Sequence, residues 1–247
     1  MKLSELLPII QDEKRSEDYL RSVGILKTFS NCSRCNGTSL GMIRGDRWKC
    51  YKCKTEWTRR KNSILSLVRI KYSEFLLCLK LFELEITAEE TANQLKLNYK
   101  TVLLLFRYFR EIISGNNILS VSINKKILVA KSEKIGIYYE GGQFHFDFEN
   151  SYSRNIASIE LDRSRVTNSA AIFETSIIIL STMNTKHLFK QPPTFQTFLR
   201  FVKERLFKFR GTNQKYLFQY LKEIEFRFYN TKEDIYNLLV SLISKNI

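Results

Sequence analysis

The chain has 247 residues, of which 44% are hydrophobic and 26% are charged, so its composition is that of a globular protein and excludes a wholly disordered chain. Its 40 Lys and Arg residues outnumber 25 Asp and Glu residues and leave a formal net charge of +15 at pH 7. A surplus of this size favours polyanions as partners, and nucleic acid is the commonest of them, although a solubility surplus with no partner gives the same balance.

No stretch of the sequence has the pattern of a membrane span or of a secretory signal. The most apolar run, FLLCLKLFELEI, is short and is interrupted by Lys80, Glu83 and Glu85. The N-terminal apolar run is followed at once by charges, unlike that of a signal peptide. Because the cysteines also occur in close pairs, we expect a protein of the reducing cytosol, or of the nucleus in a eukaryote. It is expected not to be secreted and to have no membrane partner.

Residues 1–28 are expected to form an N-terminal helical segment, and residues 29–62 carry the strongest motif of the chain. Two Cys-x-x-Cys pairs are separated by fourteen residues: Cys32 and Cys35, then Cys50 and Cys53. Two such turns complete a tetrahedral sulfur cage, and a hairpin with Gly45-Asp46 at its turn is expected between them. The motif predicts a zinc ribbon whose metal is structural, since four thiolates leave no open position. The fifth cysteine, Cys78, is expected to be a buried small hydrophobe.

Basic and aromatic residues alternate around these cysteines, which suits contact with phosphates and packing on bases or sugars. Trp48 and Trp57 have an alternative role as the core of a small module, and for Trp48 this role is favoured. The residues of the ribbon that are expected to bind DNA are Arg47, Lys52, Arg59, Arg60 and Lys61.

Residues 63–115 have helical periodicity and are expected to form a helix-turn-helix. Thr87 begins a capping-box pattern with Glu90, and Asn98 can cap the helix that follows. A plain helical hairpin that binds nothing has the same pattern, but a position directly after a basic ribbon favours DNA binding. The second helix is expected to present four residues outward, the first three of them as DNA contacts: Tyr99, Lys100, Arg107 and Arg110.

Residues 116–247 are expected to form a further domain with strands and helices, so that the whole chain is an α+β multi-domain protein. Strand-like alternation occurs in ILSVSINKKILVA, KIGIYYEGGQFHFDFE and NIASIELDRS, and TSIIIL has the pattern of a short buried strand. Helical patterns follow in TFQTFLRFVKERLFKF and NQKYLFQYLKEIEFRFYN. A last helix is expected to be opened by Thr231, with Asp234 at its third position.

The predicted order of parts is a ribbon, a helix-turn-helix and an α/β core. Three segments within these parts carry a resemblance to a known family: RWKCYKCKTEWTRRKNSIL, IASIELDRSRVT and FQTFLRFVKERLFKFRGTNQKYLFQYLKEIEFRFYN. Their residues and order resemble those of the DDE transposases of the Merlin group and their bacterial insertion-sequence relatives. Such transposases cut and join DNA with two metal ions, which three carboxylates hold on a ribonuclease-H-like fold. The resemblance implies a ribonuclease-H-like domain with terminal helices over residues 116–247, double-stranded DNA as partner and a possible homo-oligomer.

The positions at which the resemblance implies the three carboxylates hold other residues. Asn124 stands in place of the first Asp, Ser181 in place of the second, and Gln196 in place of the Glu. An amide or a hydroxyl cannot supply the negative charge that holds a pair of divalent ions. The sequence therefore predicts a transposase-like DNA-binding protein that lacks strand-transfer catalysis and whose metal is structural zinc.

An active DDE transposase with displaced carboxylates is the alternative. His145, Asp147 and Glu149 lie on one face of a strand-like segment, where they could build a site for Mg²⁺ or Mn²⁺. Acids on a half-exposed strand are more often simply solvated. On the sequence alone, the question of enzymatic activity stays open.

Overall fold

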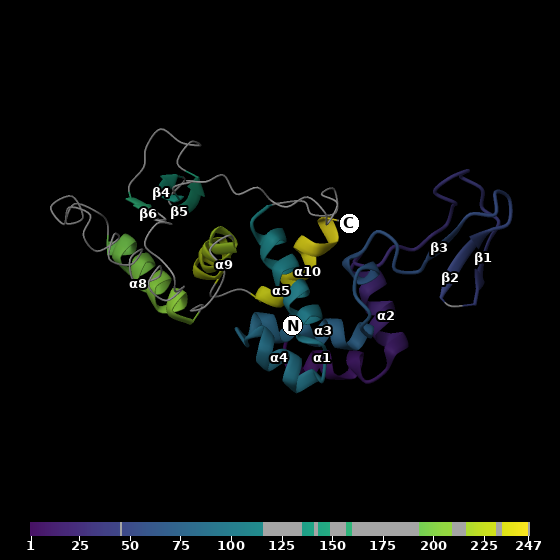
Figure 1. Ribbon diagram of the computed structural model, residues 1–247, viewed down its shortest axis with the longest axis horizontal. Helices are drawn as coiled ribbons and strands as arrows, with labels where there is room; N and C mark the ends of the chain where they lie inside the picture. The colour runs from purple at the N-terminus through teal and green to yellow at the C-terminus, as the bar shows by residue number, and fades with distance from the viewer. Residues whose placement is uncertain are drawn as a thin grey trace. The chain divides into compact units, whose positions relative to one another are not determined.

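The structure is a computed structural model that describes residues 1–44, 46–115, 135–140, 143–148, 157–159, 193–208, 216–230 and 234–246. In these residues the chain is a mixture of helices and sheets, with eight α-helices and two three-stranded antiparallel sheets (Figure 1). The chain divides into two compact units. The first comprises Met1–Ile123 and Glu233–Ile247, and the second comprises Asn124–Lys232.

The first unit begins with two helices, α1 (Leu3–Ile10) and α2 (Glu13–Ser22). The side chain of Asp12 caps α2 by accepting a hydrogen bond of 3.0 Å from the backbone N–H of Lys14. Both helices pack against α3 (Tyr72–Glu83), with Leu6 and Leu20 fully buried. The N-terminal helices therefore belong to the same core as the predicted helix-turn-helix.

The cysteine-rich segment folds as an antiparallel meander of three short strands. These are β1 (Leu40–Ile43), β2 (Arg47–Cys50) and β3 (Glu56–Thr58), with β2 in the centre. The hairpin between β1 and β2 turns where it was predicted, and Asp46 has a left-handed φ of 54° there. Trp48 lies opposite Trp57 across the sheet, which places both indoles on one face.

The segment predicted as a helix-turn-helix contains α4 (Ala88–Leu95) and α5 (Tyr99–Ile113), which pack on each other and on α3. Thr87 Oγ1 accepts a hydrogen bond of 3.1 Å from the N–H of Glu90, and Asn98 Oδ1 accepts one of 2.8 Å from the N–H of Lys100. Both predicted N-caps are thereby confirmed, while the carboxylate of Glu90, which was expected to complete a capping box, accepts a hydrogen bond of 2.6 Å from Gln94 Nε2. A short 3₁₀ helix, η1 (Ile64–Ser66), connects the ribbon to α3.

Phenylalanine rings form the core between α3 and α5. The ring centroid of Phe82 lies 5.1 Å from that of Phe106 and 5.3 Å from that of Phe109, and both pairs have edge-to-face geometry. Cys78 is fully buried beside them, as predicted, and burial raises the pKa of its thiol to about 12. In the described parts of the chain, every helix is too short or too polar to cross a membrane.

The last helix of the chain, α10 (Ile235–Lys245), returns to the first unit and packs against α3 and α5 (Figure 1, yellow beside teal). The sequence placed it instead with the domain of residues 116–247. The prediction that Asp234 is the third residue of this helix is wrong, because Asp234 is the N-cap and accepts a hydrogen bond of 3.2 Å from the N–H of Asn237. Thr231 lies outside the described residues.

The second unit contains a three-stranded antiparallel sheet and two helices. Its strands are β4 (Ile135–Glu140), β5 (Gln143–Phe148) and β6 (Ala157–Ile159), with β4 in the centre. Its helices are α8 (Pro193–Lys208) and α9 (Leu217–Tyr229), and α9 packs on α8 and on β5. The predicted strands ILSVSINKKILVA and TSIIIL lie outside the described residues.

Candidate metal centre and nucleic-acid interface

The four predicted zinc ligands converge on one point. The Sγ atoms of Cys32 and Cys53 are 3.5 Å apart, those of Cys35 and Cys50 are 3.6 Å apart, and all four lie within 4.8 Å of one another. A tetrahedral zinc ion with Zn–S bonds of about 2.3 Å holds its sulfurs about 3.8 Å apart. The cluster therefore has the donor set and the dimensions to hold a metal ion such as zinc. In the described part of the chain it is the one group of potential metal ligands.

The surroundings of these thiols shift their pKa values in different directions. Hydrogen bonding to the hydroxyl and backbone of Thr55 lowers the pKa of Cys53 to about 6. For Cys35, a backbone hydrogen bond from Gly37 lowers the pKa, but hydrogen bonding with the other three thiols and burial outweigh it and raise the pKa to about 11. The pKa values of the two thiols thus depart from the ordinary value in opposite directions. A divalent cation stabilises the cysteines that coordinate it as thiolates and displaces their protons.

The apolar core of the ribbon is very small. Phe29 makes edge-to-face contacts with Trp57 at 5.6 Å and with Trp48 at 6.4 Å between ring centroids. These rings pack against the cysteine cluster, and Trp57 is only 5% exposed. The two indoles are therefore core residues, as was favoured for Trp48, rather than surfaces for bases.

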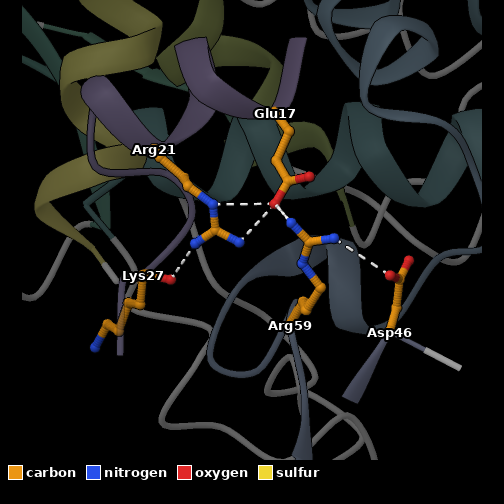
Figure 2. A network of polar contacts seen from close by, with 5 residues as sticks. All are labelled: Glu17, Arg21, Lys27, Asp46 and Arg59. Atoms are coloured by element: carbon orange, nitrogen blue, oxygen red, sulfur yellow. Dashed lines mark hydrogen bonds and ion pairs between the residues drawn. The ribbon is translucent and has the colours of Figure 1, made fainter. Parts of the chain in front are cut away.

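A network of polar contacts fastens the ribbon to α2 (Figure 2). Glu17 Oε1 accepts hydrogen bonds of 3.0 and 2.6 Å from Arg21 Nε and Nη2, and it also forms an ion pair with Arg59 Nη2. Arg59 Nη1 reaches Asp46 Oδ1, at the turn of the ribbon hairpin, over 3.2 Å. Arg21 Nη1 donates to the backbone carbonyl of Lys27 over 2.6 Å. The guanidinium of Arg59, which the sequence assigned to DNA, thus joins the ribbon to the helices.

Helix α2 also holds the start of α3. Glu13 accepts hydrogen bonds from the backbone N–H of Tyr72 at 2.5 Å and from the backbone N–H and hydroxyl of Ser73 at 3.2 and 2.9 Å. A carboxylate at this position satisfies two of the unpaired N–H groups at a helix N-terminus. One face of α2 therefore contacts the ribbon through Glu17 and the helix-turn-helix core through Glu13.

Two further basic residues of the predicted DNA interface also have contacts within the protein. The guanidinium of Arg60 lies 4.6 Å above the ring of Tyr72, and its Nη1 donates to the carbonyl of Val68 over 3.4 Å. Lys61 Nζ donates to Ser33 Oγ over 2.9 Å. Arg60 thereby ties the end of the ribbon to α3, and Lys61 ties it to the first cysteine turn.

The basic side chains that the ribbon leaves to solvent lie elsewhere. Arg47 and Lys52, which were predicted to bind DNA, are both exposed, and Arg47 Nη1 lies 3.6 Å from Glu56 Oε2. The structure adds three exposed basic residues that were not assigned to DNA: Arg34, Arg44 and Lys54. Their position beside the cysteines in sequence was the signal that could have identified them.

On α5 the predicted DNA contacts fall into two groups. Tyr99 is 49% exposed and Lys100 is also exposed, at the first turn of the helix. Arg107 is half-buried further along. The outward position predicted for Arg110 is wrong: it is 7% exposed and lies 5.3 Å above the ring of Phe82. The helix is packed so closely by its neighbours that only its N-terminal turn is exposed.

In the second unit, one residue of the alternative catalytic site, His145, contacts a carboxylate of α9. Glu225 of α9 is 8% exposed, and its Oε1 lies 3.0 Å from His145 Nδ1 and 2.9 Å from Lys222 Nζ. Its Oε2 accepts a hydrogen bond of 2.9 Å from the backbone N–H of Phe146. His145 therefore faces a carboxylate from the C-terminal part of the chain.

The three positions at which catalytic carboxylates were implied are only partly described. Gln196 lies in the first turn of α8. Asn124 and Ser181 lie outside the described residues, as does Glu149 of the alternative site.

No protein-family model matches the chain, and no curated protein or solved structure matches it either.

Proposed function

We propose that this chain is a transposase-derived protein that binds double-stranded DNA through a zinc ribbon and a helix-turn-helix and lacks strand-transfer catalysis. One observation carries the proposal. The exposed N-terminal turn of α5, with Tyr99 and Lys100, belongs to the same compact unit as a four-cysteine cluster. The net charge of +15 over the whole chain favours a polyanion as its partner.

The exposure of α5 fits the way such helices bind DNA. In a helix-turn-helix, the N-terminal residues of the second helix contact base edges in the major groove while its flanks contact the phosphate backbone. Here Tyr99 and Lys100 are the exposed residues of the helix, and Asn98 and Lys96 in the preceding turn are exposed as well. Buried residues further along α5, among them Val102, Leu105 and Phe106, anchor this turn in the core.

The absence of catalysis rests on the sequence resemblance. With an amide at positions 124 and 196 and a hydroxyl at position 181, the implied ribonuclease-H-like domain would have no carboxylate at the three implied positions to hold a pair of Mg²⁺ or Mn²⁺ ions. The zinc is a structural ion in this proposal, and a homo-oligomer is part of what the resemblance implies.

The binding proposal is tested by measuring affinity for duplex DNA over a range of salt concentrations with the zinc-loaded full-length chain. We expect Lys100→Ala to weaken binding several-fold and to reduce the slope of log K against log salt by about 1, because one phosphate contact is lost. Lys14→Ala, at an exposed position on α2, is the matched control and should leave both quantities unchanged. Equal effects of the two variants would contradict the assignment of the interface to α5.

The catalytic part is tested separately by incubating supercoiled DNA with the protein and Mg²⁺ or Mn²⁺. We expect no nicking by the wild-type chain. Nicking that disappears in Asp147→Ala would overturn the loss of catalysis and establish the alternative of an active enzyme, while leaving the DNA-binding proposal intact.

A further inference from the structure

One face of the ribbon sheet carries an exposed aromatic ring among basic residues. In antiparallel pairing, directly opposed residues share a face. Gly41 pairs with Lys49, Lys49 pairs with Glu56, and Arg47 pairs with Thr58, so these side chains lie on the face opposite to the indoles. We define the outer ribbon face by Gly41, Arg47, Lys49, Tyr51 and Glu56.

Tyr51 is held on this face by a close contact with β1. A Cβ atom added at Gly41 would meet Tyr51 Cε2 and the Tyr51 hydroxyl oxygen at 2.6 Å, so the ring lies directly against the glycine backbone. Tyr51 nevertheless remains 48% exposed. Its neighbour Lys52 lies in the same way across Gly37, where its Cδ would be 3.2 Å from an added Cβ. The second cysteine turn therefore presents a positioned ring, which loses little side-chain entropy when a ligand binds it.

The charges around the ring are only partly balanced. Glu56 is the acidic partner of both basic residues of this face, at 3.1 Å from Lys49 Nζ and 3.6 Å from Arg47 Nη1. The side chain of Arg47 is 49% exposed and that of Lys49 is 32% exposed. Two cations share one carboxylate, so the face keeps a positive surplus that an incoming phosphate can bind.

An exposed aromatic ring beside exposed cations is suited to one form of DNA in particular. In a duplex each base is stacked between its neighbours, and its π-face is not available to a protein ring. In single-stranded DNA the bases can stack on aromatic side chains while basic residues follow the backbone. We propose that the outer ribbon face binds an unpaired segment of the DNA, with a base stacked on Tyr51 and phosphates on Arg47 and Lys49. The inference rests on the proposed function and adds a second form of DNA to it.

The experiment compares two fluorescent probes: a blunt duplex, and the same duplex with a single-stranded extension of thymidines. Both are titrated with the zinc-loaded full-length chain. We expect the extension to strengthen binding about ten-fold and Tyr51→Ala to remove that gain, since a gain of this size is within the range that stacking of one base contributes. Tyr51→Phe should retain the gain, because it retains the ring. Lys100→Ala should weaken binding to both probes alike.

Two further variants keep the tyrosine and test its surroundings. Gly41→Ala displaces the ring through its new Cβ and should lower binding to the extended probe as Tyr51→Ala does. Glu56→Gln releases Arg47 and Lys49 and should strengthen binding to the extended probe a few-fold. Retention of zinc and of tryptophan emission in each variant shows that the ribbon is folded.

The inference and the proposed function fail in different ways. Absence of binding to the blunt duplex overturns the proposed function. Equal affinity of the wild-type chain for both probes, or an equal effect of Tyr51→Ala on both, overturns the inference and leaves the proposed function standing.

Discussion

The ribbon and the helical part of the first unit are stabilised in different ways. The ribbon has a core of three aromatic rings around four cysteines, whereas the helical part buries a set of phenylalanine, leucine and isoleucine side chains between α3, α5 and α10. A module as small as the ribbon excludes little apolar surface from water, so we expect a metal ion held by the four cysteines to supply the rest of its stability. The helices depend on packing instead.

The difference shows what the link between the two parts must do. A metal ion held by the four cysteines would fix the ribbon internally, but it would not fix the ribbon relative to α5. That orientation depends on the carboxylates of α2, because Glu17 pairs with Arg59 and Glu13 binds the start of α3. A surface that combines the ribbon with α5 therefore requires three separate contributions: metal, apolar core and polar link. Each can be removed by itself.

Removal of the metal site should have the largest effect and be confined to the ribbon. Cys50→Ser should abolish zinc binding and unfold the ribbon, since structural zinc contributes about 10–16 kcal/mol in comparable small modules. Both tryptophans of the chain lie in the ribbon, so tryptophan emission reports on it alone. We expect a red-shifted emission with most of the helical circular dichroism retained. Cys78→Ala is the control and should keep its zinc; an unshifted emission in Cys50→Ser would contradict the comparison.

A cavity in the helical core should have the opposite effect: it should destabilise the helices and leave the ribbon folded. Phe109 is fully buried between Phe75 and Phe82, so Phe109→Ala should lower the free energy of unfolding by about 3–5 kcal/mol. The measurement is urea unfolding followed by circular dichroism. Leu84→Ala is the control: this side chain is 55% exposed, and its loss should change the free energy of unfolding by less than about 0.5 kcal/mol. Loss of zinc from Phe109→Ala at low urea would show that the two parts do not fold independently.

Breaking the polar link should have an intermediate effect. The side chain of Glu17 is 10% exposed, and Glu17→Gln leaves Arg21 and Arg59 without their shared carboxylate. We expect a loss of about 1–3 kcal/mol in thermal unfolding of the zinc-loaded protein, because half-buried guanidinium groups lose a charged acceptor. The exposed Glu89 of α4 supplies the control variant Glu89→Gln. Matching melting temperatures for the two variants would argue that the network is not a link.

The smallest effect concerns pH and belongs to the helical part alone. The pKa of Cys78 is raised by burial from 9.0 to about 12, so the native state keeps its thiol protonated where the unfolded state ionises. Its contribution is complete below pH 9 and is lost as the pH rises from 9 towards 12. Cys78→Ala should therefore reduce the fall in stability between pH 8 and pH 10 by about 1 kcal/mol. An identical fall in both proteins would show that this thiol is not protected.

Local sequence patterns predicted much of this structure. The two Cys-x-x-Cys turns, the hairpin between them and the caps at Thr87 and Asn98 each depend on residues only a few positions apart. The elements KIGIYYEGGQFHFDFE and TFQTFLRFVKERLFKF also fold as the strands and the helix that their periodicity predicts. Spacing along the chain determines the geometry in all these cases, because the atoms involved cannot move far apart.

Only the tertiary structure decided the roles of the basic residues and the position of the last helix. In the sequence, the basic residues around the ribbon and on α5 look like a DNA interface. In the structure, Arg59 contacts Glu17, Arg60 contacts Tyr72 and Arg110 contacts Phe82. The return of α10 to the first unit and the contact of Tyr51 with Gly41 were equally absent from the local pattern. A charged side chain is satisfied by whichever partner the fold brings near it, and for most of these residues that partner lies on a segment distant in the chain.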